Sequence, residues 1–186
     1  MIKKFIASVC LCVMGIMNSV AADITVAEPE FAGDIYIVSA DGTELEDLEV
    51  QTIKQKTQAS AGMWLSGGMG GSVRMRYEVE KTASPKRLSN GNEIYFLFKS
   101  TDNSINPKNC LAVFKLDVAK KRRYAEMAKT STFGGTESSA GNSLPFTAKK
   151  YGESSYLIKV TGLEPGEYGI NSSMDASKFY MFGIDR

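Results

Sequence analysis

The chain contains no histidine, and this absence excludes several large classes of enzyme. A Ser-His-Asp triad and a Cys-His pair both need an imidazole as general base. HExxH metalloproteases and histidine-containing zinc sites need the same side chain. No local motif indicates a Ser-Lys pair or a pair of catalytic carboxylates. The sequence therefore assigns no catalytic residue, and we expect a protein that is not an enzyme.

Cysteine is also scarce, since the chain has only Cys10, Cys12 and Cys110. The first two lie in a segment that we expect to be removed, so Cys110 has no partner for an intramolecular disulfide. A single thiolate cannot build a structural zinc site, which takes four ligands. Because Cys110 opens the apolar run 110–114, we predict a reduced cysteine buried within a strand. We also predict that folding needs no metal and no cofactor.

Long apolar runs are absent except at residues 5–17, which follow Lys3 and Lys4 and precede the small residues 19–22. This order is typical of a secretory signal peptide, and the run is shorter than the ~20 residues that span a bilayer. We therefore expect cleavage after Ala21 or Ala22 and a secreted or periplasmic protein without a transmembrane segment.

Lipidation is a weaker interpretation of the same segment. A lipobox has a small residue before its cysteine, whereas Val9 precedes Cys10 and Leu11 precedes Cys12. We therefore do not expect a lipoprotein.

The periodicity of the remaining chain is that of short strands. Residues 72–80 alternate, with Val73, Met75, Tyr77 and Val79 on one face and polar side chains on the other. Turn signals recur about every 8–12 residues, as in an antiparallel sandwich or a closed barrel. We predict one all-β domain over residues 23–186. Its expected architecture is an antiparallel β-sandwich, jelly-roll or immunoglobulin-like, of nine or ten strands with little helix. Residues 124–129 fit a helix or a strand.

The glycine-rich segment from Gly62 to Gly71 is the main compositional oddity. A phosphate-binding loop is excluded, because no Gly-Lys-Ser/Thr follows and the next element is a strand. One interpretation is a mobile tip that presents Trp64, Met63 and Met69 to a ligand. The other is a hairpin tip with Trp64 folded back into the core. Both stay open, and these three side chains are the candidate ligand-binding residues.

Two clusters of charge are further candidates. Lys120, Lys121, Arg122 and Arg123 form the densest basic run, which is either a cationic hairpin tip or a solvated strand edge. Residues 41–47 gather four carboxylates but match a calcium loop only in part, so a solvated turn is expected.

Charge also limits the class of partner. Removal of Lys3 and Lys4 lowers the formal net charge from +1 to −1, which gives no long-range attraction to nucleic acid. Tyr124 is the only aromatic residue beside the basic run, so we expect no nucleic-acid binding.

Several segments together resemble a group of secreted proteins of Bacteroides-type gut bacteria. The segments are residues 28–34, 114–115, 120–126, 145–152, 165–170 and 182–185. The resemblance implies a cell-envelope setting and carries over no functional residue.

Together these observations predict an exported, non-enzymatic β-sandwich of the cell envelope that binds or scaffolds an unknown partner. One alternative is a module that binds a glycan or a peptide through the loop from Gly62 to Gly71. Another is a hydrolase that works without histidine. The oligomeric state stays open.

Overall fold

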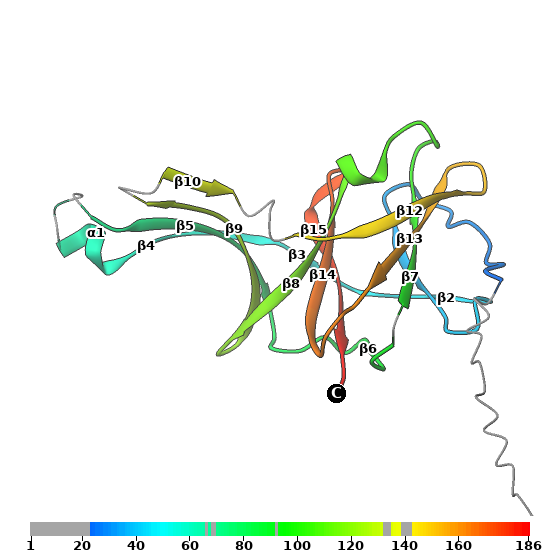
Figure 1. Cartoon of the computed structure of the whole chain (residues 1–186), viewed down its shortest axis with the longest axis horizontal. Helices are drawn as coiled ribbons and strands as arrows, with labels where there is room; N and C mark the ends of the chain where they lie inside the picture. The colour runs from blue at the N-terminus through cyan, green and yellow to red at the C-terminus, as the bar shows by residue number, and fades with distance from the viewer. Residues whose placement is uncertain (1–22, 66, 68–69, 92, 132–134, 139–142) are drawn as a thin grey trace, which may run out of the picture.

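The computed structural model describes residues 23–65, 67, 70–91, 93–131, 135–138 and 143–186. These residues form two packed, mostly antiparallel β-sheets with little helix, which confirms the predicted all-β sandwich (Figure 1). The predicted signal peptide, residues 1–22, lies outside the described residues. Within the described ranges, no helix combines the length and the apolar character needed to cross a membrane.

The first sheet has five strands in a simple order. From one edge to the other they are β12 (Phe146–Tyr151), β13 (Ser155–Thr161), β7 (Glu93–Lys99), β1 (Ile35–Val38) and β2 (Leu45–Glu46). All of these neighbours are antiparallel.

The second sheet is longer and carries three short accessory strands. Its path is β3 (Glu49–Thr52), β15 (Asp175–Ile184), β14 (Gly166–Ser172), β8 (Leu111–Ala119), β9 (Arg122–Ser131), β5 (Ser72–Glu80) and β4 (Lys54–Ala59). Off this path, β10 (Gly135–Ser138) pairs with β9, β11 (Ser143–Leu144) with β8, and β6 (Arg87–Leu88) with β15 in parallel. Two short helical segments, α1 (Ala61–Leu65) and η1 (Pro107–Asn109), complete the described elements.

The two ends of the second sheet meet, because its edge strands β3 and β4 are separated in the chain only by Ile53. The sheet therefore curls round on itself. The side chain of Gln51 bridges the remaining gap: its amide nitrogen donates to the Glu80 carbonyl and its amide oxygen accepts from the Glu80 N–H at 2.8 Å. A side chain thus takes the place of a missing strand pairing and gives the N–H and carbonyl of Glu80 their hydrogen-bond partners.

The main core lies between the two sheets. Phe96 and Phe98 from the first sheet are fully buried against Phe182 and Tyr168 from the second. The rings of Tyr168 and Phe182 stack with centroids 5.4 Å apart, and those of Phe96 and Phe182 lie 5.2 Å apart. Such contacts add to the hydrophobic burial that drives folding.

A second core fills the inside of the curl, and Phe114, Phe179 and Met181 are its central residues. Strand β15 alternates between the cores, since Tyr180 and Phe182 face the first sheet while Phe179 and Met181 face the curl. A strand that is buried on both faces has a continuous apolar sequence instead of an alternating one, and residues 179–184 have such a sequence.

One end of this second core is ionic. Arg123 is completely buried, and its guanidinium lies 2.8 Å from the Glu49 carboxylate and 3.2 Å from that of Glu167. Arg87 also pairs with Glu167, and the backbone N–H of Ser84 donates to the same carboxylate at 2.8 Å. Buried charges persist only when they are paired in this way.

A carboxylate anchors the N-terminal segment to the first sheet. Glu28 accepts hydrogen bonds from the Ser155 hydroxyl at 2.6 Å, the Lys99 ammonium at 3.0 Å, and the N–H groups of Glu153 and Ser154. Gly152 has a φ of 57°, and a Cβ at this position would collide with the Glu28 carboxylate. The β12–β13 turn therefore needs a glycine here.

Several sequence predictions are refined by the strand boundaries. Residues 124–129 are strand, as part of β9, because residues 74–78 of β5 pair with them. The described residues contain more strands than the nine or ten expected, since two-residue strands such as β2 carry no alternation. The polar face of β5 is less solvated than predicted, because Glu78 is buried.

Cys110 is placed differently from the prediction. It is only partly buried and caps η1 one residue before β8, because Pro107 at the start of the helical turn delays the strand. It is a free cysteine that packs against the main core, and its Sγ lies 3.5 Å from the Pro107 carbonyl oxygen.

We expect the Cys110 thiol to react slowly but measurably without denaturant. Burial raises its pKa, so less thiolate is present at neutral pH, and the thiolate is the nucleophile. Labelling with a disulfide reagent at pH 7.5 should be at least about tenfold slower than that of a free thiol. Labelling as fast in the native protein as in urea would contradict this expectation.

Candidate functional site

An arm of sheet extends from the packed core. It consists of β4, β5, β9 and β10, and α1 lies at its far end between β4 and β5 (Figure 1). Every residue of β4 is exposed. Only the part of the arm nearest the core adds apolar side chains to the second core, including Val79 and Ala125.

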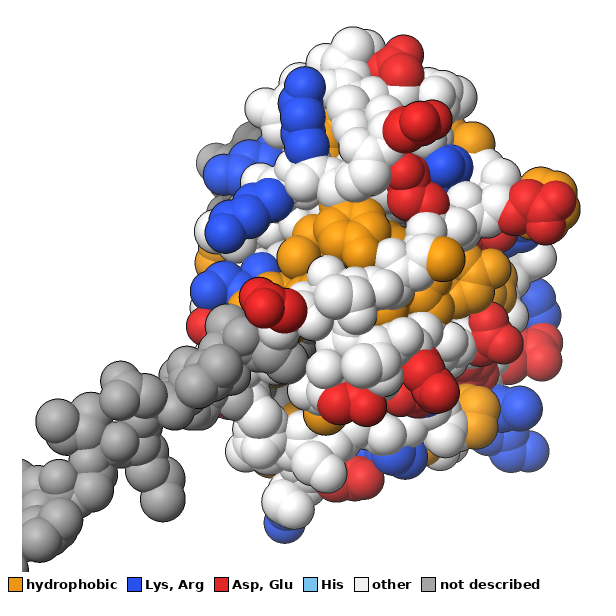
Figure 2. Space-filling view, turned by 90° about the vertical axis from the view of Figure 1, so that its right-hand side faces the viewer, with side chains coloured by type: hydrophobic (Ala, Val, Ile, Leu, Met, Phe, Trp, Pro, Cys, Tyr) orange, Lys and Arg blue, Asp and Glu red, His pale blue; other side chains and the backbone are white. Residues whose placement is uncertain are grey.

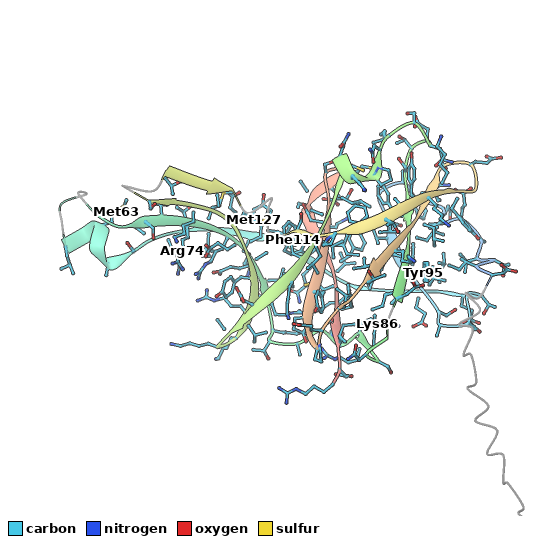
Figure 3. All side chains as sticks on the ribbon, viewed as in Figure 1. Met63, Arg74, Lys86, Tyr95, Phe114 and Met127 are labelled. Atoms are coloured by element: carbon cyan, nitrogen blue, oxygen red, sulfur yellow. The ribbon has the colours of Figure 1, made fainter. Side chains whose placement is uncertain are left out.

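The two faces of the arm differ in chemistry because successive strand residues point to opposite sides. One face carries the predicted apolar series Val73, Met75, Tyr77 and Val79 of β5. The other carries Arg74, Arg76, Glu78 and Glu80 together with their cross-strand neighbours. Figure 3 shows Arg74 on the lower side of the arm and Met63 at its far end.

The register of the polar face places like charges directly opposite each other. Lys56 of β4 lies opposite Arg76 of β5, and Arg74 lies opposite Lys129 of β9. Such pairs destabilise a sheet. Glu126 offsets part of the repulsion, because its carboxylate lies 3.7 Å from Arg74 and 3.6 Å from Arg76. Folding alone gives no reason for this concentration of cations.

Three adjoining shallow hollows, of about 470, 550 and 620 Å³, follow this face, and we call them together the cationic channel. Eight lysine and arginine residues line it against two glutamates. The lining residues are Lys54, Lys56, Gln58, Ala59, Ser60, Ser72, Arg74, Arg76, Glu78, Val79, Glu80, Lys81, Thr82, Lys120, Lys121 and Arg122.

Only some of these cations have carboxylate partners. Lys54 pairs with Glu80 at 2.6 Å and lowers the pKa of that carboxyl, and Arg122 pairs with Glu78 at 2.9 Å. In the part of the chain that the structure describes, no carboxylate lies within 4.0 Å of Lys56, Lys120 or Lys121. The channel therefore has cationic groups left for a ligand.

Arg76 is the most firmly positioned of the channel cations. Its guanidinium lies 4.4 Å from the centre of the Tyr124 ring and donates to the amide oxygen of Gln58 at 2.9 Å. Its Nε is buried and has no hydrogen-bond partner among the described residues. A planar guanidinium held in this way suits carboxylate, sulfate or phosphate groups.

The predicted basic run contributes to the channel only in part. Lys120 and Lys121 form the turn between β8 and β9, as expected for a cationic hairpin tip, and Lys120 has a φ of 42°. Arg122 lines the channel, but Arg123 points to the inside of the curl and is fully buried. The expectation that Arg123 lies on the surface with the rest of the basic run was wrong. Arg122 and Arg123 are consecutive residues of one strand, so their side chains face opposite sides.

The described residues of the glycine-rich segment lie at the end of the arm. Met63 is half-buried, and Gly71 has a φ of 135° at a point where a Cβ would lie 2.7 Å from the Met63 nitrogen. Close packing therefore requires this glycine. Ser66, Gly68 and Met69 lie outside the described residues, as does the side chain of Trp64. The role proposed for Trp64 and Met69 stays a prediction.

The N-terminal segment at the opposite end of the molecule is acidic, a feature that our sequence analysis missed. Residues 23–53 contain nine aspartates and glutamates and no lysine or arginine, whereas residues 54–131 contain fifteen lysines and arginines against six acids. Figure 2 looks onto this end and shows acidic side chains scattered over the face, with basic ones grouped at its left edge and others on its right side and lower rim. Counting charge by segment would have found this separation, which the net charge of −1 hides.

A further hollow of about 480 Å³ lies beside the first sheet, between Lys86 and Tyr95 (Figure 3). Its charged side chains and Tyr95 already have partners, since Lys86 pairs with Glu46, Arg87 with Glu167, and the Tyr95 hydroxyl donates to Glu93 at 2.7 Å. The described residues contain no cluster of three His, Cys, Asp or Glu side chains placed to hold a metal ion. The cationic channel is therefore the best candidate site.

The chain matches no protein-family model, and no curated protein matches its sequence.

Proposed function

We propose that the chain is an exported, non-enzymatic binding protein of the cell envelope and that the cationic channel is its binding surface for an extended anionic partner. The observation that carries this proposal is the excess of eight cations over two carboxylates along one exposed strip of sheet. The order of residues 1–22, typical of a signal peptide, supports export. The resemblance to secreted proteins of Bacteroides-type bacteria agrees with this setting.

The shape of the arm favours a ligand that lies along it. The hollows follow β4 and β5 from the β8–β9 turn towards α1, so successive anionic groups of one partner can meet successive cations. Cations clustered on one surface raise the local concentration of an anionic partner and its association rate. Gln58, Ser60 and Ser72 add uncharged hydrogen-bonding groups that would orient the partner.

The exposure of β4 fits a binding surface better than a structural role. Ordering each backbone residue costs about 1–2 kcal/mol, and β4 buries none of its residues in return. Its lysines also protect a free strand edge from unwanted pairing. Because β4 gains no burial from being ordered, we infer that it serves as a binding surface rather than as part of the core.

The glycan- or peptide-binding alternative uses the same end of the molecule. Ser60 and Ser72 line the channel and flank the glycine-rich segment. An acidic polysaccharide would therefore satisfy both interpretations, because its sugar rings would reach the loop while its charges lie on the arginines.

Binding to dextran sulfate, compared with neutral dextran, tests the proposal. We expect salt-sensitive binding to the sulfated polymer only, since each exposed contact is screened by salt. The double variant Lys56→Glu/Lys121→Glu should weaken this binding at least about tenfold. Lys149→Glu/Lys150→Glu makes the same charge change at two exposed positions on β12 and should change it less than about twofold. Equal losses in both variants, or no binding by the wild type, would refute the proposal.

A further inference from the structure

The cationic arm and the acidic end lie at opposite ends of the long axis of the molecule. In Figure 1, β4, β5 and α1 are at one extreme, while β2 and the N-terminal segment are at the other. Asp23, Glu30, Asp41, Glu44 and Asp47 are all exposed in this acidic segment. The chain therefore carries two complementary surfaces that a single molecule cannot bring together.

We infer that the anionic partner of the cationic channel is the acidic end of a second copy of this chain, so that copies associate head to tail. The inference rests on the proposed function, because it names the occupant of the same channel. A head-to-tail contact uses two different surfaces of each copy, which leaves one of each free at the ends of the assembly. Addition of further copies gives a linear chain or a ring.

Charge also disfavours the symmetric alternative. Two copies that met through their arms would place the lysines and arginines of one channel against those of the other. Like-charge juxtaposition costs several kcal/mol at an interface. The contact between arm and acidic end instead pairs the eight lysines and arginines of the channel with the exposed carboxylates of residues 23–53.

The low net charge removes the usual barrier to such association. Without residues 1–22 the formal net charge is −1, so whole molecules repel each other little. The attraction between the unlike ends remains at short range. Salt screens it over about one Debye length, which is about 10 Å at 0.1 M salt.

Sedimentation velocity of residues 23–186 over a range of concentrations tests the inference. We expect the weight-average sedimentation coefficient to rise with concentration at about 0.02 M salt and to return to that of the monomer at about 0.5 M salt. Lys56→Glu/Lys121→Glu on the arm should weaken association at least about tenfold. Glu44→Lys/Asp47→Lys at the acidic end should do the same, whereas Lys149→Glu/Lys150→Glu should change it less than about twofold.

Mixing the two charge-reversed variants in equal amounts gives the sharpest result. The reversed arm of one variant then faces the reversed end of the other, and the two unreversed surfaces also remain complementary. We expect the mixture to regain association that neither variant shows alone. Monomer at every concentration, or association that survives Glu44→Lys/Asp47→Lys, would overturn the inference.

The same variants separate this inference from the proposed function. A wild type that stays monomeric while its arm binds dextran sulfate overturns the self-association and leaves the channel as a binding surface. Arm variants that keep full binding to dextran sulfate overturn the proposed function instead.

Discussion

Replacing Arg123 by methionine should lower the free energy of unfolding by about 3–5 kcal/mol. Arg123 is completely buried and holds the carboxylates of Glu49 and Glu167, which are each 8% exposed. Without the guanidinium, Glu49 loses its cation inside the curl, and Glu167 keeps Arg87 and the Ser84 N–H as partners. A buried charge without its partner is among the most destabilising changes that a single substitution makes.

Urea denaturation at pH 7 measures this effect. Lys121→Gln, two residues away on the exposed turn, is the matched control and should change the free energy of unfolding by about 0.5 kcal/mol or less. Adding Glu49→Gln to Arg123→Met should recover part of the loss, because it removes the stranded charge. A loss for Arg123→Met no larger than that of the control would show that the network contributes little.

Replacing Glu28 by glutamine should lower the free energy of unfolding by about 2 kcal/mol at pH 7. Burial raises the pKa of this carboxyl, but the hydrogen bonds from Ser155, Glu153, Lys99 and Ser154 outweigh burial and lower the pKa from 4.5 to about 2. A carboxyl whose pKa is lowered by folding stabilises the fold at pH values above the pKa that it has in the unfolded chain. That stabilisation is lost as the pH falls through the folded value.

The pH dependence is the diagnostic part of this prediction. The difference in unfolding free energy between the wild type and Glu28→Gln should be largest above pH 5 and shrink steadily towards pH 2. Glu30→Gln makes the same charge change at an exposed neighbour in the same segment and is the matched control. A difference that stays constant from pH 7 to pH 2 would mean that the charge of Glu28 plays no part.

The sheet-forming parts of the fold were predictable where the hydrophobic pattern was strong. Strand β5 has the boundaries expected from its alternation, and the cores of β7, β8 and β15 were found from their apolar runs. Strand β4 was missed because Lys54–Ala59 is polar on both faces, and its position comes from pairing with β5 alone. Pairing partners far apart in the sequence leave no local signal.

The candidate site was predictable only in fragments. The basic run was visible, and Lys120, Lys121 and Arg122 do line the channel. The arginines of β5 and the lysines of β4 join them through strand pairing, which the sequence does not reveal. Arg123 was placed wrongly for the same reason. Its ion-pair partners Glu49 and Glu167 lie 74 and 44 residues away in the chain, so the local basic run gave no sign that this residue is buried.

The continuity of β3 and β4 through Ile53 has a mechanical consequence. A pull on the end of the arm travels along this single extended segment into β3, which lies antiparallel against β15 over residues 49–52. Hydrogen bonds perpendicular to the strands then bear the force in shear and must break together, rather than unzip one after another. Tension applied to the end of the arm would therefore reach the core through the β3–β15 pairing, loaded in shear.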